Sequence, residues 1–190
     1  MKKRILVAST GASGQPLLIK CLEIIREQPE FESWLIMSGG AKLTLAQETD
    51  LPLDQVEAMA DHALAPDEIG AAPASGSFQM KGMLIVPCSM KTAAGIAAGY
   101  AENLILRAAD VTIKEQRTLV LAARETPLSP IHLRNLKELS GIPGVRIIPP
   151  MMTFYHKPKT IDEMAYHIAA RLLEPFGIEA KEYRRWNGIL

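Results

Sequence analysis

The chain alternates between short runs of apolar residues and longer segments in which apolar residues recur with helical spacing. Five times, an apolar run of strand length is followed by a segment with helical periodicity. Continuous apolar runs are typical of strands buried on both faces, and their alternation with helices indicates parallel βαβ units. The pattern predicts an α/β fold, a parallel sheet with helices on both faces. The predicted strand and helix pairs are 4–9 with 16–28, 33–38 with 41–50, 82–89 with 92–100, 118–123 with 130–140, and 145–150 with 160–177.

Two segments depart from this alternation. The connection from Leu53 to Gly82 is long and contains the low-bulk stretch GAAPASGSFQ, which predicts a surface loop or flap rather than a second core. An additional helix is expected from Leu104 to Glu115, ahead of the fourth strand.

Two helix starts carry capping residues. Ser129 stands before Pro130, which suits the first helical position. Thr160 and Glu163 have the T-x-x-E spacing of a capping box. We therefore expect helices to begin directly after Ser129 and Thr160.

Composition narrows the class of protein. The chain has 190 residues and 21 basic against 21 acidic side chains, so no net charge favours nucleic acid or an anionic membrane. We expect one domain over 1–190, with a tail over about 179–190 that docks through Trp186 on the body or on a neighbouring subunit. No apolar stretch is long enough to span a membrane. Two cysteines, Cys21 and Cys88, predict free thiols in a cytoplasmic protein rather than a disulfide framework.

Small, hydroxyl and charged residues gather directly after the predicted strands. Ligands of open parallel sheets bind at the carboxyl ends of the strands, where helix N-termini present backbone N–H groups. Any one of these segments is explained by helix capping, but their occurrence together at one sheet edge favours an anion site. The segments are Gly11-Ala12-Ser13-Gly14, Ser38-Gly39-Gly40, Cys88-Ser89-Met90-Lys91-Thr92, Arg124-Glu125-Thr126 and Tyr155-His156-Lys157.

Missing motifs restrict the ligand. Neither G-x-G-x-x-G nor G-x-x-x-x-G-K-[ST] is present, which disfavours a dinucleotide and a P-loop nucleotide. A mononucleotide with one phosphate, such as FMN, fits a site built from several loops. The histidines show no i, i+4 ligand spacing, so no metal site is expected: His62, His132, His156 and His167.

Nine segments together resemble the flavin prenyltransferases of the UbiX type, particularly those that accompany aromatic-acid decarboxylases. In chain order they are TGASG, LIMS, ETD, ASGSF, PCSMKT, NLILRAADVTIKEQR, RETPLSPIHL, FYHKP and RRW. The resemblance implies a single-domain, Rossmann-like or flavodoxin-like homo-oligomer, commonly a dodecamer, that binds reduced FMN. It also implies transfer of a dimethylallyl group from dimethylallyl phosphate to flavin N5 and C6, giving prenylated FMN for a partner decarboxylase of the UbiD type.

The resemblance also implies roles for individual residues. Ser13 and Glu125 match positions that handle protons, and Tyr155 and Arg171 match contacts to the prenyl phosphate, with Lys114 adding positive charge there. Two departures from many relatives, Gly39-Gly40 and Gln15-Pro16, concern the flavin contacts. The implied FMN contacts are Gly11, Ala12, Ser13, Ser38, Ser89, Met90, Lys91, Thr92 and Arg124.

The residues are compatible with prenyl transfer without a metal. No D-D dipeptide is present to hold magnesium, and Lys114, Arg171 and the Tyr155 hydroxyl can neutralise a monophosphate leaving group through charge-assisted hydrogen bonds. Glu125 can act as acid and base in turn if burial brings its titration near neutrality. Two alternatives stay open: an FMN-dependent decarboxylase of the cysteine-decarboxylase type, and a non-catalytic FMN-binding subunit of a decarboxylase.

Overall fold

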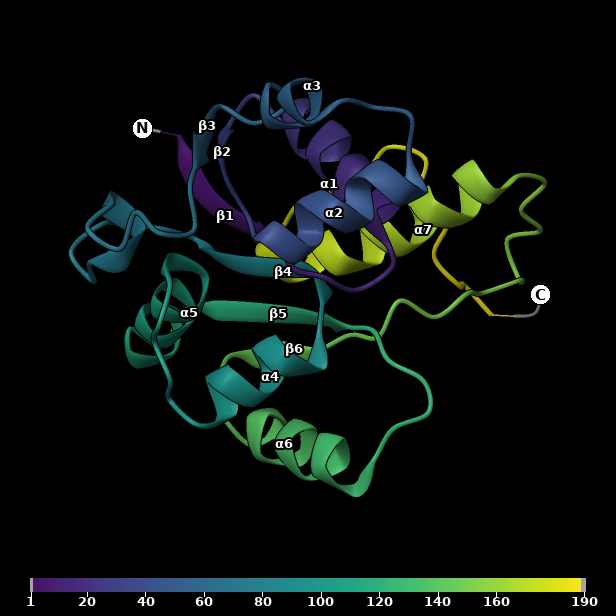
Figure 1. Ribbon diagram of the computed structural model, residues 1–190. Helices are drawn as coiled ribbons and strands as arrows, with labels where there is room; N and C mark the ends of the chain where they lie inside the picture. The colour runs from purple at the N-terminus through teal and green to yellow at the C-terminus, as the bar shows by residue number, and fades with distance from the viewer. Residues whose placement is uncertain (1, 189–190) are drawn as a thin grey trace.

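Six parallel strands form one sheet in the order β3-β2-β1-β4-β5-β6 in a computed structural model that describes residues 2–188 (Figure 1). The strand order reverses between the neighbours β1 and β4. This reversal is the topological switch point, the place where open α/β sheets form a crevice for ligands. The strands are β1 (Lys3–Ser9), β2 (Phe31–Met37), β3 (His62–Leu64), β4 (Gly82–Cys88), β5 (Thr118–Ala123) and β6 (Val145–Ile147).

Helices cover both faces of the sheet, which confirms the predicted α/β architecture (Figure 1). One face carries α1 (Gln15–Arg26), α2 (Gly39–Glu48), α3 (Leu53–Glu57) and α7 (Ile161–Leu173). The other face carries α4 (Met90–Ala97), α5 (Leu104–Lys114) and α6 (Pro130–Ser140). Two short 3₁₀ helices are Ala72–Ala74 and Glu174–Phe176.

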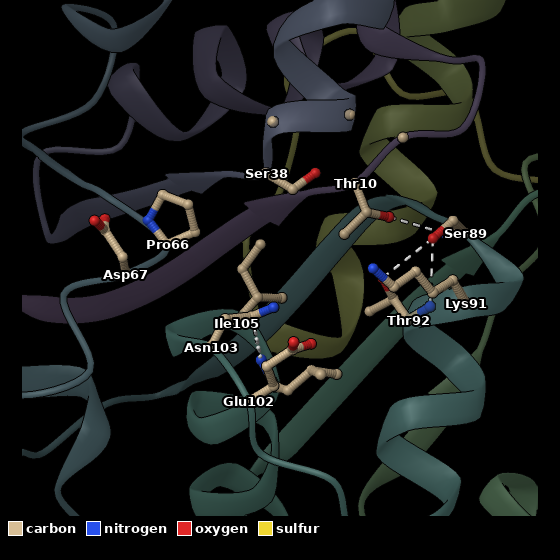
Figure 2. A pocket seen from close by; sticks show the side chains of 14 residues that line it. Thr10, Ser38, Pro66, Asp67, Ser89, Lys91, Thr92, Glu102, Asn103 and Ile105 are labelled. Atoms are coloured by element: carbon tan, nitrogen blue, oxygen red, sulfur yellow. Dashed lines mark hydrogen bonds between the residues drawn. The ribbon is translucent and has the colours of Figure 1, made fainter.

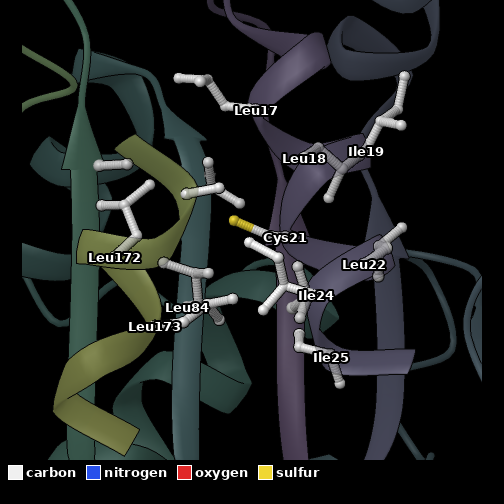
Figure 3. Close-up of a cluster of buried hydrophobic side chains, with 14 of the residues drawn as sticks. Leu17, Leu18, Ile19, Cys21, Leu22, Ile24, Ile25, Leu84, Leu172 and Leu173 are labelled. Atoms are coloured by element: carbon white, nitrogen blue, oxygen red, sulfur yellow. The ribbon is translucent and has the colours of Figure 1, made fainter. Parts of the chain in front are cut away.

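Alternate side chains of the central strands supply two separate cores. In β1, Ile5 and Val7 pack in the layer beneath α1 and α7, whereas Leu6 and Ala8 pack beneath α4 and α5. This is why the strand reads as a continuous apolar run. Figure 3 shows the first core, where the Cys21 sulfur lies among leucines and isoleucines of α1 and leucines of β4 and α7. Burial raises the pKa of the Cys21 thiol far above its usual value, and both cysteines are free as expected.

The connection between β2 and β4 holds more regular structure than the sequence predicts. It contains α3 and the edge strand β3, which pairs with β2 from Trp34 opposite His62. The Asp61 carboxylate accepts hydrogen bonds from the backbone N–H of Ser33 at 2.8 Å and from its hydroxyl at 3.0 Å. The connection forms no second core, as expected, but the sequence interpretation missed α3 and β3, because a three-residue edge strand leaves no readable periodicity.

The predicted helix caps are present, with one difference. Ser129 caps α6 as expected, and its hydroxyl accepts the backbone N–H of His132. Thr160 caps α7, but the Glu163 carboxylate accepts the N–H of Lys159 rather than that of Thr160, so the reciprocal half of the capping box is absent. Within residues 2–188, none of the helices is long and apolar enough to cross a membrane.

Candidate functional site

A cavity of about 620 Å³ opens at the switch point between β1 and β4, at the carboxyl edge of the sheet. Its walls come from the loops after β1, β2 and β4, from the connection between β3 and the 3₁₀ helix Ala72–Ala74, and from the start of α5 (Figure 2). Five of the nine residues predicted to contact FMN line it. They are Gly11, Ser38, Ser89, Lys91 and Thr92.

Three helix N-termini border this cavity. Ser38 caps α2 by accepting the N–H of Ala41 at 3.1 Å, and Ser89 caps α4 by accepting the N–H of Thr92 at 3.3 Å. Asn103 caps α5 in the same way. Helix N-termini carry partial positive charge and unpaired N–H groups, and Lys91 adds a full positive charge to the lining. Asp67 and Glu102 also line the cavity, so the part that suits a phosphate group is the part formed by the starts of α2 and α4.

Thr10 joins the two strands that flank the switch point. Its hydroxyl donates to the carbonyl oxygen of Pro87 at 2.9 Å and accepts the N–H of Ser89 at 2.8 Å, with the side chain buried (Figure 2). Thr10 therefore fixes the start of α4 relative to the loop after β1. The sequence interpretation missed this residue; its position directly before Gly11 is the only signal that could have indicated it.

The loop after β1 passes very close to the start of α2. A β-carbon added to Gly11 would lie 3.1 Å from the Cα of Gly40, and one added to Gly40 would lie 3.1 Å from the Cα of Gly11. Both distances are shorter than ordinary carbon contacts. The unusual Gly39-Gly40 pair thus has a structural reason at Gly40, which allows the two loops to approach.

Glu48, at the end of α2, holds the loop after β1 at the N-terminus of α1. Its Oε2 accepts the backbone N–H groups of Gly14 and Gln15, both at 2.8 Å. Partial burial opposes ionisation, but hydrogen bonds from the Ser13 hydroxyl and these two amides, with the charge of Arg124, lower the pKa of Glu48. Glu48 belongs to the ETD segment, but no pattern in the sequence predicts this role for it.

Ser13, Arg124 and Glu125 lie beside the cavity rather than in its lining. The Arg124 Nε donates to the carbonyl oxygen of Ser13 at 3.1 Å, which ties the loop after β5 to the loop after β1. Glu125 is exposed, and its carboxylate accepts the N–H of Thr126 at 3.0 Å. The burial expected for an acid and base group is therefore not supplied by this subunit alone.

Tyr155 and Arg171 line a second cavity of about 140 Å³ beside α7. Apolar side chains including Ile148 and Ile168 form part of its wall. The Arg171 Nη1 donates to Glu174 at 2.5 Å. Although partial burial opposes ionisation of Glu174, hydrogen bonds from Arg171 and Arg185 lower its pKa. A cation and a phenol in an apolar wall suit a small molecule with a phosphate head and a hydrocarbon tail.

Three predicted site residues lie elsewhere in the subunit. Met90 is buried in the core beneath α4, and Ala12 lies outside the cavity lining. Lys114 ends the eleven-residue helix α5, whose first residues border the large cavity. At the helical rise per residue, Lys114 is about 15 Å from that end. There it pairs with Glu115 at 2.6 Å, near the amino edge of the sheet.

Comparison with known proteins supplies a family context. Residues 1–172 match the family described as Flavoprotein. The chain is 50% identical over 186 residues to the flavin prenyltransferase LpdB of Lactiplantibacillus plantarum, covering 98% of this chain and 99% of LpdB.

Two solved structures superpose closely. The crystal structure of AnUbiX in complex with FMN and dimethylallyl pyrophosphate has a TM-score of 0.97 and 44% identity, and the match covers 100% of both chains. The structure of a dodecameric FMN-dependent Ubix-like decarboxylase from Escherichia coli O157:H7 has a TM-score of 0.95 and 48% identity, with coverage of 97% of this chain and 100% of that one.

Proposed function

Because the chain belongs to the UbiX-like flavin prenyltransferases of the flavoprotein family, we propose that it joins a dimethylallyl group from dimethylallyl phosphate to reduced FMN. The product, prenylated FMN, passes to a partner decarboxylase of the UbiD type. The observation that carries the proposal is the cavity at the switch point, where the N-termini of α2 and α4, their capping serines and Lys91 can bind a flavin phosphate.

FMN binds in the large cavity with its phosphate near Ser38 and the segment from Ser89 to Thr92. The hydroxyls of these residues and the N–H groups at the starts of α2 and α4 supply hydrogen bonds to phosphate oxygens. Gly11 lets the loop after β1 approach the start of α2, and this close approach shapes the cavity wall. Reduced flavin supplies the nucleophilic ring atoms, and the protein binds and orients the ring.

The second cavity binds the prenyl phosphate. Arg171 and the Tyr155 hydroxyl contact the phosphate, and the apolar wall holds the hydrocarbon tail. Charge-assisted hydrogen bonds stabilise the phosphate as it gains charge on leaving, so no metal ion is required.

Lys114 reaches the site from a neighbouring subunit. Within its own chain it lies one helix length away from the large cavity. The dodecameric state of the Escherichia coli relative supports a homo-oligomer here, and assembly would bring the end of α5 of one subunit to the cavity of another. The same assembly provides the burial that Glu125 lacks in one subunit.

A monophosphate donor fits the charges better than a pyrophosphate. Arg171 and Arg185 share the single carboxylate of Glu174, so this cluster has only one net positive charge beside the second cavity. AnUbiX was crystallised with dimethylallyl pyrophosphate, which makes that compound the relevant competitor. The test is to measure kcat/KM for dimethylallyl phosphate and for dimethylallyl pyrophosphate under strictly reducing conditions. A higher value for the pyrophosphate would refute the proposed preference for the monophosphate.

Glu125 and Ser13 move protons between the flavin and the leaving phosphate. In Glu125→Gln, size and hydrogen bonding are retained but titration is lost, so prenylation should slow by roughly 10²–10⁴ while FMN affinity stays unchanged. The matched control is Glu138→Gln, an exposed carboxylate on α6, which should behave like the wild type. A protein that only carries FMN would not show a slowed prenylation rate together with an unchanged FMN affinity. Wild-type rates in Glu125→Gln would show that the assignment is wrong.

A further inference from the structure

Two histidines and a threonine lie beside Tyr155, and two of them, Thr153 and His167, line the second cavity with it. The rings of His156 and His167 stack with centroids 3.9 Å apart and planes 4° from parallel. His167, on α7, is only 6% exposed, and the Tyr155 ring meets it edge-on at 5.5 Å. Thr153 touches both histidines through its hydroxyl. The proposed function gives none of these three residues a role.

The hydrogen bonds of His167 determine which of its nitrogens carries the proton. Nε2 lies 3.1 Å from the carbonyl oxygen of Arg184, which can only accept a hydrogen bond. Nε2 must therefore be protonated, and the network assigns the tautomer. The same Nε2 lies 3.3 Å from the Tyr155 hydroxyl oxygen, so its N–H is shared between two acceptors. The phenol oxygen accepts, and its own proton remains available.

The protonated Nε2 of His167 also determines the donors and acceptors in the other hydrogen bonds of this cluster. In the tautomer that is protonated at Nε2, His167 accepts at Nδ1 from the Thr153 hydroxyl at 3.2 Å. The Thr153 oxygen in turn accepts from His156 Nδ1 at 3.5 Å, a long contact. His156 Nε2 is then an acceptor, and in the described part of the chain it is buried without a partner. Burial, with the charge of Arg184, lowers the pKa of His156, which favours a neutral ring in the stacked pair.

We propose that His167 is a positioning residue: its Nε2–H donates to the Tyr155 hydroxyl and leaves the phenol proton free to be donated to a phosphate in the second cavity. Tyr155 and Arg171 both line that cavity, so the phenol O–H of Tyr155 and the guanidinium of Arg171 are available to the same phosphate. The inference rests on the proposed function to the extent that Tyr155 binds the prenyl phosphate. Without the histidine, the phenol would be free to rotate or to donate elsewhere.

The first test is spectroscopic and needs no enzyme activity. Solid-state ¹⁵N spectra of the full protein with labelled histidine report the protonated nitrogen of each ring, and loss of one signal set in His167→Gln identifies His167. We expect a neutral ring protonated at Nε2. A ring protonated only at Nδ1 would make the phenol the donor to histidine and would overturn the proposal, whatever the enzyme catalyses.

The second test uses kinetics with the prenyl donor. His167→Phe keeps an aromatic ring but removes the donor, and we expect kcat/KM for dimethylallyl phosphate to fall by about tenfold, the effect of one misdirected hydrogen bond to a charged group. FMN affinity should not change. His167→Gln, whose amide can place an N–H near the Nε2 position, should recover most of the loss. Equal losses in both variants would indicate a packing role only.

A double-mutant cycle shows whether His167 acts through Tyr155. In a Tyr155→Phe background, His167→Phe should cause no further loss. Additive losses overturn the inference and leave the proposed function intact. If Tyr155→Phe has wild-type kinetics, Tyr155 does not bind the prenyl phosphate and the inference fails with that role. If the wild type does not prenylate FMN at all, the proposed function is refuted, and the tautomer measurement alone decides whether His167 donates to Tyr155.

Discussion

Replacing Gly11 with valine tests whether the loop after β1 belongs to the flavin site. The β-carbon would lie 3.1 Å from the Cα and 3.2 Å from the carbonyl carbon of Gly40, so the loop must move by a few tenths of an ångström before the two methyl groups are accommodated. Both obstructing atoms are backbone atoms at the start of α2, and they cannot rotate away. Overpacking of this kind costs about 1–3 kcal/mol. If the displacement is transmitted to bound flavin, affinity falls by about 5–150-fold.

The assay is titration of FMN fluorescence with Gly11→Val, after circular dichroism and size-exclusion chromatography have shown native fold and assembly. Gly70→Val is the matched control, because a β-carbon at Gly70 meets nothing within 4 Å and Gly70 lies outside the cavity lining. The control should bind FMN like the wild type. A folded Gly11→Val protein with undiminished affinity would refute the placement of flavin against this loop.

Two further predictions follow from the hydrogen bonds and charges of the site. Glu48→Gln should lower the free energy of unfolding at pH 7, measured by urea titration, by about 1–2 kcal/mol. This is at the low end of the range for hydrogen bonds to a charged group, because the two bonds are partly exposed. Because the folded chain lowers the pKa of Glu48 below 4.5, this difference should persist above pH 4.5 and vanish as the pH falls through the folded-state pKa; a pH-independent difference would contradict it. Dialysis against EDTA should leave the prenylation rate unchanged, and rescue by magnesium after such treatment would exclude the metal-free mechanism.

Much of the fold could be predicted from local pattern because the central strands are buried on both faces. β1 and β4 each read as one apolar run, since alternate residues enter different cores. β3 escaped prediction because its three residues at the sheet edge are largely exposed. The fifth predicted strand, 145–150, ends at Ile147, and the prolines at 149 and 150 lack the N–H that would extend its ladder.

The candidate site could be predicted in part for the same reason. Small and hydroxyl residues after parallel strands necessarily meet at one edge, and so Ser38 and Ser89 border one cavity. Thr10 and Glu48 were missed because each acts through partners far along the chain; Glu48 lies 34 residues from Gly14. The separation of Lys114 from the cavity follows from topology, since a helix that leads into a strand ends at the amino edge of the sheet.

The most direct test of prenyl transfer is mass spectrometry of the flavin released after the protein is incubated anaerobically with reduced FMN and dimethylallyl phosphate. The proposed function predicts a flavin heavier by one five-carbon prenyl unit, formed in proportion to enzyme and time, with release of inorganic phosphate. Recovery of unmodified FMN alone from folded, flavin-loaded protein would contradict it and would leave a flavin-binding protein with another role.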